Sequence, residues 1–267
     1  KNKNKSILTL TKGVEFLFKK NKIIHLKGVG SILDKNTVTV INDSGKKVNY
    51  KAKNIVISTG SVPTSLPGIK IDEKIIVSST GALSFGKVPK ELVVIGGGYI
   101  GLELSSVWKR LGSNVTVVEF LDHILPGMDK DISVEFLKIL TKQGINFELD
   151  SKVTEVNIVK NKAVVDFTNN TSKIRKRMEC DKVLVAVGRK SNINKNVLEI
   201  GIKLDDKEKI QVNEKFETSV KNIFAIGDVI NKGPMLAHKA EEEGIAVAEI
   251  IAGQSGHVNY DVIPAVV

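Results

Sequence analysis

The clearest chemical signal in this sequence is a glycine-rich turn that follows a short apolar run. Leu92–Ile95 lead directly into Gly96-x-Gly98-x-x-Gly101. In this pattern the first glycine permits a tight turn, the second lets the backbone approach a pyrophosphate, and the third allows a helix to pack closely on a strand. Apolar residues at helical spacing follow, so the N–H groups at the start of that helix would face the phosphates. The spacing predicts a dinucleotide-binding turn.

Glu119 is the second part of this signal. It ends the next β-branched run, Asn114–Val118, close to the roughly 20-residue spacing at which a carboxylate accepts hydrogen bonds from an adenosine ribose. Such a carboxylate would repel a 2′-phosphate, and no arginine lies between residues 120 and 125. NAD is therefore favoured over NADP. The plainer alternative is a glycine turn followed by an ordinary surface glutamate.

Other polar residues have two interpretations each. Glu103 falls in the first turn of the expected helix, where it would either lie near a nicotinamide or complement the helix dipole. Glycines also end the apolar runs at 58–61, 187–189 and 226–228, and ligands bind at this edge of open α/β sheets. Asp228 would either bond a sugar-like hydroxyl or cap the following turn. Spacing alone leaves these alternatives open.

The histidines and the single cysteine exclude several kinds of site. His25, His123 and His257 have no ligand-like spacing, and His238 precedes a glutamate-rich helix. We therefore predict no metal site, and no Ser-His-Asp arrangement is recognisable. Cys180, the only cysteine, excludes an intramolecular disulfide and a cysteine-based zinc site, and we expect it to be a packed thiol.

The composition is that of a soluble globular protein. The chain has 267 residues, 42% hydrophobic and 26% charged, enough for one large or two medium domains. The net charge is +10, but the lysines are scattered and aromatic residues make up only 5%, which favours solvated surface over nucleic-acid binding. No apolar run approaches the roughly 20 residues of a membrane span. The start shows no targeting pattern and no methionine, so we expect the chain to be part of a longer protein.

Residues 1–60 are expected to form strands and turns. The strands are predicted at 22–26, 37–41, 46–51 and 54–58, and a turn falls at Asp43-Ser44-Gly45. Prolines and glycines predict a domain boundary near residues 62–70.

From about residue 90, strands and helices alternate. We expect three strands with two helices between them, at 92–95, 100–111, 114–118, 131–141 and 145–149. This order predicts an α/β domain with a parallel sheet covered on both faces. The remaining expected elements are an inserted antiparallel hairpin (153–159 with 163–167), strands at 181–187 and 222–226, and a helix at 239–251.

Several segments together resemble the family of pyridine nucleotide-disulfide oxidoreductases. Residues 93–120 (VVIGGGYIGLELSSVWKRLGSNVTVVEF) resemble the NAD-binding segment of its dihydrolipoamide dehydrogenase branch. Residues 218–229 (TSVKNIFAIGDV) and 233–244 (GPMLAHKAEEEG) resemble its second FAD-contacting segment, and the STGS and VGR turns occur in the same order. The resemblance spans essentially the whole chain. It implies a Rossmann-like parallel sheet with an inserted antiparallel β-meander in an NAD domain, plus a partial FAD/NAD(P)-binding domain.

The resemblance implies two cofactor sites, one for NAD and one for FAD. The implied NAD contacts are Gly96, Gly97, Gly98, Tyr99, Ile100, Gly101, Leu102, Glu103, Glu119, Val153 and Gly188. The implied FAD contacts are Gly30, Thr59, Gly60, Ser61, Asp228, Met235, Leu236, Ala237 and His238. The implied domains are a partial FAD-binding domain at 1–69, an NAD-binding domain at 70–192 and a returning FAD-domain and central segment at 193–267.

The resemblance also implies an activity, partners and a compartment. Electrons would pass from a dihydrolipoyl dithiol to a protein disulfide, then to FAD and then to NAD⁺. The implied partners are the dihydrolipoyl groups of acyltransferases or glycine-cleavage carrier proteins and a second copy in a homodimer, with no nucleic acid and no membrane. The implied location is the mitochondrial matrix, with a plastid-like organelle or the cytoplasm as alternatives.

Two features of the family have no counterpart in this sequence. Its paired redox cysteines and its proton-managing His-Glu pair are absent, so we expect no catalytic residue here and no turnover of dihydrolipoamide by the chain alone. Two alternatives remain open: an NADPH-dependent reductase similar to glutathione or mercuric reductase, and a nucleotide-binding module without redox activity. Glu119 argues against the first.

Overall fold

The computed structural model describes residues 2–194 and 196–267, which divide into two compact units. The first unit comprises Lys1–Thr59 with Ile193–Val258, and the second comprises Gly60–Asn192 with Asn259–Val267. The first division therefore falls earlier than the expected boundary at 69–70. The reason is that β5 (Ser61–Pro63) pairs with β14 (Arg189–Ser191), which holds Ser61 in the second unit.

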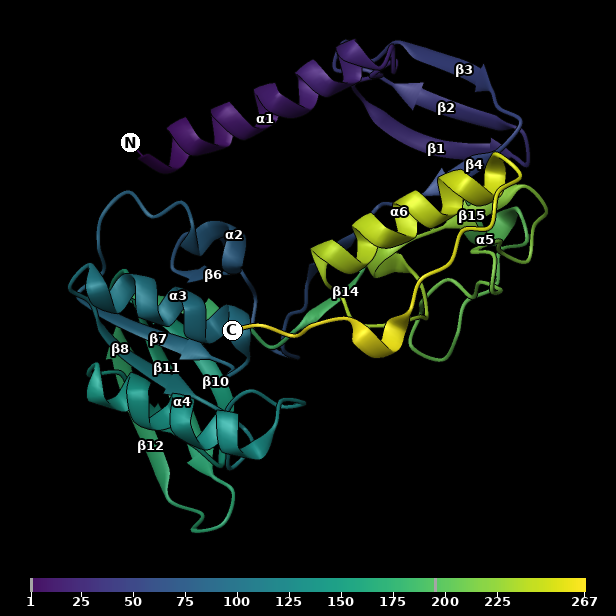
Figure 1. The fold of residues 1–267 in the computed structure, drawn as a ribbon. Coiled ribbons are helices and arrows are strands. Elements are labelled where there is room, and N and C mark those ends of the chain that lie inside the picture. The colour runs from purple at the N-terminus through teal and green to yellow at the C-terminus, as the bar shows by residue number, and fades with distance from the viewer. Residues whose placement is uncertain (1, 195) are drawn as a thin grey trace. The chain divides into compact units, whose positions relative to one another are not determined.

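The second unit is built on a five-stranded parallel sheet with the order β6-β13-β7-β8-β9. Its strands are β6 (Ile76–Val77), β7 (Glu91–Ile95), β8 (Asn114–Val118), β9 (Asn146–Glu148) and β13 (Lys182–Val185). Helix α3 (Tyr99–Arg110) connects β7 to β8, and α4 (Lys130–Lys142) connects β8 to β9 (Figure 1). The predicted alternation of strands and helices is confirmed.

Both faces of this sheet are covered, by different kinds of element. Successive side chains of a strand point to opposite faces. On one face Val94 packs in a cluster with Trp108 of α3 and Leu140 of α4. On the other face Val93 packs with Phe167 of an antiparallel meander. The meander consists of β10 (Ser151–Val159), β11 (Lys162–Asn169) and β12 (Arg175–Cys180).

The third meander strand, β12, was not predicted from the residue pattern, which indicated only a hairpin, whereas the β-meander implied by the family resemblance is confirmed. Its sequence RKRMEC has no clear apolar alternation, because most of its side chains face solvent and only Cys180 is buried. Its place is set by pairing with β11 and by an ion pair between Arg177 and Asp166 at 2.7 Å.

The first unit contains a second, separate set of strands. Strands β1 (Val29–Asp34), β2 (Thr37–Ile41) and β3 (Lys47–Lys51) form an antiparallel sheet, and β4 (Ile55–Ile57) pairs in parallel with β15 (Ile223–Ala225). The helical elements of this unit include α5 (Asn196–Glu199), η1 (Gly227–Val229) and α6 (Ala237–Ile251). The short helices α2 (Ser79–Ala82) and η2 (Tyr260–Val262) belong to the second unit. The strands expected near 37–41, 46–51, 54–58 and 222–226 and the helix near 239–251 are confirmed.

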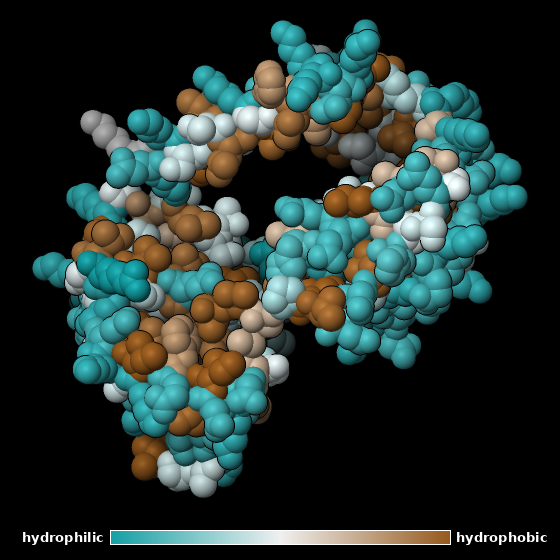
Figure 2. Space-filling view, viewed as in Figure 1, coloured by the Kyte–Doolittle hydropathy of each residue, from teal (hydrophilic) through white to brown (hydrophobic). Residues whose placement is uncertain are grey.

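Helix α1 (Asn2–Lys20) contradicts the expectation that residues 1–60 form only strands and turns. No strand forms at 22–26 either, and β1 begins only at Val29. The signal for a helix was present, because Ile7, Leu10, Val14 and Leu17 recur at helical spacing. None of the described residues of α1 is buried, and apolar side chains lie on its surface (Figure 2).

Among residues 2–194 and 196–267, no helix combines the length and the apolar character needed to cross a membrane.

Candidate nucleotide-binding sites

The glycine-rich turn joins β7 to α3 in a conformation that needs two of its glycines. Gly96 has a φ of 110°, in the region that favours glycine, and a Cβ there would overlap the carbonyl oxygen of Ala186. A Cβ on Gly101 would overlap the carbonyl oxygen of Gly96. These two glycines therefore let the first turn of α3 lie directly against the turn and strand.

Gly98 has a different role, because it leaves the start of α3 open. It is the N-cap residue, with φ −77° and ψ 171°, and makes no side-chain capping hydrogen bond. A Cβ on Gly98 would meet no other heavy atom within 4 Å. The first N–H groups of a helix have no partner inside the helix, so this end of α3 presents donors and the positive end of its dipole beside open space. That is the geometry that binds a pyrophosphate.

Glu119 connects the end of β8 to this turn. Its side chain is buried, with 8% of the residue exposed. One carboxylate oxygen accepts a hydrogen bond from the Gly97 N–H, and the other accepts one from the Leu121 N–H at 2.8 Å. A carboxylate has about four lone-pair sites, so about two remain for hydroxyl donors. The structure thus brings together the glycine turn and the carboxylate that the sequence predicted as partners.

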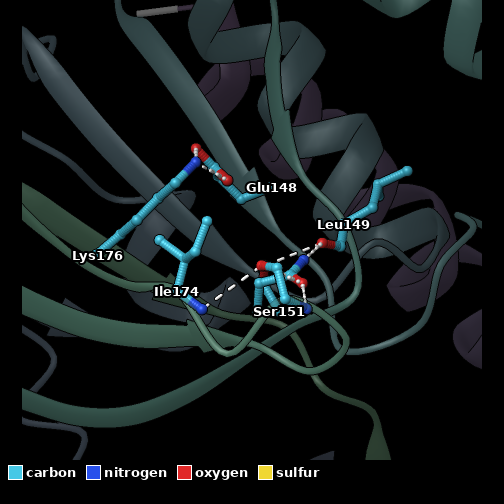
Figure 3. A network of polar contacts seen from close by, with 7 residues as sticks. Glu148, Leu149, Ser151, Ile174 and Lys176 are labelled. Carbon is cyan, nitrogen blue, oxygen red and sulfur yellow. Dashed lines mark hydrogen bonds and ion pairs between the residues drawn. The ribbon is translucent and has the colours of Figure 1, made fainter.

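The backbone of Glu119 is held by the corner between β9 and β10. The Ser151 N–H donates to the Glu119 carbonyl oxygen at 2.8 Å, and the Ser151 hydroxyl donates to the Leu149 carbonyl oxygen at 2.9 Å. Lys176 and Glu148 form an ion pair at 2.8 Å beside this corner (Figure 3). These contacts fix the direction in which the chain leaves β8.

The other predicted NAD residues all belong to the second unit but differ in exposure. Tyr99 and Glu103 are exposed on α3, whereas the Leu102 side chain is fully buried in the core below the helix. Val153 is half-buried on β10, and Gly188 is exposed after β13 with a φ of 124°. A direct contact from the Leu102 side chain to a cofactor is excluded by its burial, so only its backbone could take part. The remaining assignments stay predictions.

Three of the predicted FAD residues are arranged around the parallel pair β4 and β15 in the first unit. Gly30 and Thr59 line one cavity of about 240 Å³, together with residues of β2, β4 and the chain near α5. Thr59 follows β4 and Asp228 follows β15, and the Ile226 N–H donates to the Ile57 carbonyl oxygen at 3.0 Å. Both polar residues therefore lie at the carboxyl edge of the same strand pair, as predicted for a ligand-binding edge.

The remaining predicted FAD residues are divided between the units. Gly60 and Ser61 belong to the second unit, where the Ser61 hydroxyl accepts a hydrogen bond from the Arg189 guanidinium at 2.7 Å. Met235, Leu236 and His238 are half-buried and Ala237 is exposed at the start of α6 in the first unit. Leu236 is the N-cap residue and makes no side-chain capping bond.

A buried ion pair on α6 was not predicted from the sequence. Lys239 and Glu243 lie 3.1 Å apart, and their side chains are 1% and 0% exposed. The signal was available: the two residues are one helical turn apart, on the face that also buries Ala246 and Val247. It was overlooked because three consecutive glutamates at 241–243 have the composition of a solvated surface.

Cys180 is a buried thiol with a raised pKa. The thiol is buried in the core of the second unit, as predicted, and burial raises its pKa from 9.0 to about 12 despite a hydrogen bond with the backbone of Val93. Across the two described stretches, no group of three or more histidine, cysteine or acidic residues is arranged to hold a metal ion.

The chain is similar to known flavoprotein reductases in sequence and in fold. A family described as "Pyridine nucleotide-disulphide oxidoreductase" matches residues 2–244. Mitochondrial dihydrolipoyl dehydrogenase from Pisum sativum is 48% identical over 266 residues, covering 99% of this chain and 53% of the relative. The mitochondrial dihydrolipoyl dehydrogenase of Dictyostelium discoideum is 50% identical over 269 residues, covering 99% and 55%.

The solved structure of an HOCl-induced flavoprotein disulfide reductase from Escherichia coli has a TM-score of 0.81 and 25% sequence identity, over 95% of this chain and 58% of that chain. This likeness confirms the predicted α/β fold class. The chain spans about half the length of the curated relatives it matches. Because the family match covers most of the chain and the glycine turn with its buried carboxylate lies within it, the chain belongs to the pyridine nucleotide-disulphide oxidoreductase family.

Proposed function

We propose that the protein containing this chain is a flavin-dependent oxidoreductase that oxidises dihydrolipoyl groups with NAD⁺. The observation that carries the proposal is the glycine turn at Gly96–Gly101, closed by the buried carboxylate of Glu119 beside the uncapped start of α3. The choice of dihydrolipoyl groups as substrate is supported by the relatives at 48% and 50% identity, which are named dihydrolipoyl dehydrogenases.

The residues of the second unit fit a bound NAD. The open space at Gly98 lets the pyrophosphate approach the N–H groups of α3, and a larger side chain there would fill that space. The lone pairs that Glu119 does not use for Gly97 and Leu121 accept the adenosine ribose hydroxyls. The negative charge of this buried carboxylate repels a 2′-phosphate, so the site selects NAD over NADP.

The first unit fits part of a flavin nucleotide. Clefts that bind ligands usually measure roughly 300–1,000 Å³, so the cavity of about 240 Å³ beside Gly30 and Thr59 holds only a portion of the dinucleotide. We assign that portion to the adenosine side and assign Asp228, at the same strand edge, to the hydroxyls of the ribityl chain. When bound, the flavin and nicotinamide supply the hydride chemistry, while these residues bind and orient them.

Cys180 does not supply the thiol chemistry of this reaction. Its side chain is buried and its pKa is raised to about 12, so it holds almost no thiolate near neutral pH. Because it is the only cysteine of these 267 residues, the dithiol–disulfide exchange needs cysteines other than those of this chain. We therefore propose the activity for the full encoded protein.

We infer that the partners are dihydrolipoyl groups carried by acyltransferases or glycine-cleavage carrier proteins, and that the protein acts as a homodimer in the mitochondrial matrix. The location is supported by the word "mitochondrial" in the names of the pea and Dictyostelium relatives. Size-exclusion chromatography with light scattering tests the dimer, and immunodetection in purified organelle fractions tests the location.

The activity is tested with the full encoded protein and two pairs of substrates. We expect NADH to form from NAD⁺ with dihydrolipoamide, and much less NADPH to form from NADP⁺. The matched control replaces dihydrolipoamide with reduced glutathione, which should give no reaction. Reduction of glutathione disulfide by NADPH without any dihydrolipoamide activity would contradict the proposal and favour a glutathione reductase-like enzyme.

A further inference from the structure

The buried ion pair of α6 is attached to the turn that carries Asp228. Glu243 accepts a hydrogen bond from the Gly227 N–H at 2.6 Å, and the Lys239 ammonium donates to the Gly227 carbonyl oxygen at 3.0 Å. The same ammonium donates to the carbonyl oxygen of Lys232 at 3.3 Å. The pair therefore holds both polar groups of the residue directly before Asp228, and also Lys232 in the loop that follows it.

Gly227 itself is in a restricted conformation. Its φ is 76°, in the region that favours glycine, and a Cβ on it would lie 3.4 Å from the Cβ of Ala240 on α6. The turn thus packs closely on the first turns of the helix. With its N–H and C=O both bonded to charged side chains, Gly227 has little freedom to rotate, and this restricts the direction in which the Cα–Cβ bond of Asp228 leaves the turn.

A contribution to the stability of the fold does not by itself explain why Lys239 and Glu243 are buried as an ion pair. Two charges that are 1% and 0% exposed have lost most of their hydration, and well-packed apolar residues of similar size often stabilise a fold equally well or better. Apolar residues could not, however, bond the N–H and C=O of Gly227. The feature that needs a lysine and a glutamate at these two positions is the bonded conformation of the turn.

We propose that Lys239 and Glu243 are positioning residues for the flavin nucleotide: they hold the Gly227–Asp228 turn so that Asp228 faces the ligand edge of β4 and β15. This inference rests on the proposed role of Asp228 in binding FAD. It adds to that role two residues that act through the backbone of Gly227 and do not touch the cofactor.

The test compares variants that separate stability from positioning, in the full encoded protein. The single substitutions Lys239→Met and Glu243→Leu each leave one buried charge without its partner, so both should lose stability and bind FAD at least about tenfold more weakly. The double variant K239M/E243L leaves no unpaired charge. It should regain part of the stability lost in the single variants, because only the buried Gly227 N–H is left without its acceptor, yet still bind FAD at least about tenfold more weakly than the wild type, because Gly227 has lost both side-chain partners.

Two controls match these variants. Glu242→Leu makes the same substitution one position away on an exposed site of α6 and should leave FAD affinity unchanged. Val247→Ala opens a cavity on the buried face of α6 and should lower stability without changing FAD affinity. FAD affinity is measured by titration of the apoprotein with FAD, and stability by denaturant unfolding.

Hydrogen exchange at the Gly227 amide provides a readout that does not depend on FAD. Protection in the wild type that is lost in E243L and K239M/E243L supports the positioning role. A double variant that binds FAD as tightly as the wild type, or unchanged protection of Gly227, overturns it. A wild type that takes up no FAD while its Gly227 amide behaves as expected contradicts the proposed function, but leaves the hold of the pair on the turn established.

Discussion

At the residue scale, the Glu119 carboxylate serves the fold and the proposed site at once. Its two oxygens accept hydrogen bonds from Gly97 and Leu121, so it fixes the glycine turn on the end of β8. Its remaining lone pairs and its charge are what we assign to NAD. The two roles can be separated in part, because glutamine removes the charge and keeps one acceptor oxygen for the backbone, while its NH2 group leaves one of the two backbone N–H groups without an acceptor.

We predict that Glu119→Gln lowers the preference for NADH over NADPH by at least about tenfold, because repulsion of the 2′-phosphate and charge-assisted bonds to the ribose are both lost. Fluorescence titration with each nucleotide measures the two dissociation constants. Glu148→Gln is the matched control: Glu148 ends the next strand but is paired with Lys176, and its loss should leave the preference unchanged. An unaltered ratio for E119Q would refute the assignment.

The burial of Cys180 predicts how its thiol reacts with alkylating reagents and how it affects the pH dependence of stability. Burial raises the pKa of its thiol from 9.0 to about 12, so iodoacetamide should leave it unmodified in the native protein and alkylate it after unfolding, as seen by mass spectrometry. Since the folded pKa lies above the unfolded one, its contribution to stability is complete below pH 9 and declines as the pH rises towards 12. Cys180→Ala should remove this alkaline decline. Rapid alkylation of the native protein would contradict the buried position.

At the element scale, the junction between β7 and α3 depends on glycines that do different things. Gly101 lets the helix approach the backbone of the turn, while Gly98 keeps the space in front of the helix open. The sequence motif contains both glycines without distinguishing them. Only their surroundings in the structure show that Gly101 is needed for packing and that Gly98 leaves space for a ligand.

We predict opposite results for alanine at these two positions. Gly101→Ala should destabilise the protein by about 1–3 kcal/mol or more, because its Cβ overlaps the Gly96 carbonyl oxygen and the backbone must move. Gly98→Ala meets no atom within 4 Å and has an ordinary φ of −77°, so it should change stability by less than about 0.5 kcal/mol but weaken NADH binding. Denaturant unfolding and nucleotide titration measure both effects. Equal stability losses for G98A and G101A would show that the turn is not arranged as described.

Elements differed in how readily the sequence predicted them. Strands β7 and β8 and helices α3 and α4 were predicted nearly to their ends, because their apolar periodicity is strong and caps or glycines mark their limits. Helix α1 and strand β12 were missed. None of the described residues of α1 is buried, and β12 buries only Cys180, so lysine-rich composition outweighed their weak periodicity.

At the scale of the whole molecule, the chain forms two units, and the two proposed ligands are assigned mainly to different ones. All the predicted NAD residues lie within Gly60–Asn192. Most of the predicted FAD residues lie in the other unit, although Gly60 and Ser61 do not.

Hydrogen exchange in the presence of NAD⁺ tests this division. We predict that NAD⁺ increases protection in peptides covering Gly96–Glu103, Glu119 and Gly188. The bound nucleotide would accept hydrogen bonds from the N–H groups of the turn and donate ribose hydroxyls to Glu119, and both contacts slow local opening of the backbone. Peptides from Ile223–Ile251 should be unaffected, and they provide the internal control within the same sample. Protection confined to those control peptides would show that NAD⁺ binds the first unit, which would contradict the prediction.

The sequence by itself determined the parts of this protein that depend on near neighbours along the chain. The Gly96–Gly101 turn, the strand and helix on either side of it, and Glu119 at the end of the next strand are all local patterns, and the chain order of strands and helices implies a parallel sheet whose carboxyl ends share one edge. These patterns were sufficient to predict the fold class and the residues of the NAD turn.

Only the tertiary structure decided which distant segments meet. It placed the meander on the face of the sheet opposite α3 and α4. It also formed the hydrogen bond between Ser61 and Arg189 and those that join the Gly227 backbone to Lys239 and Glu243. Each of these contacts joins residues separated along the chain or depends on which face of a helix is buried. The free energy of such contacts comes from desolvation and packing against neighbours that no local pattern specifies, so a glutamate-rich stretch with a surface composition could contain a fully buried carboxylate.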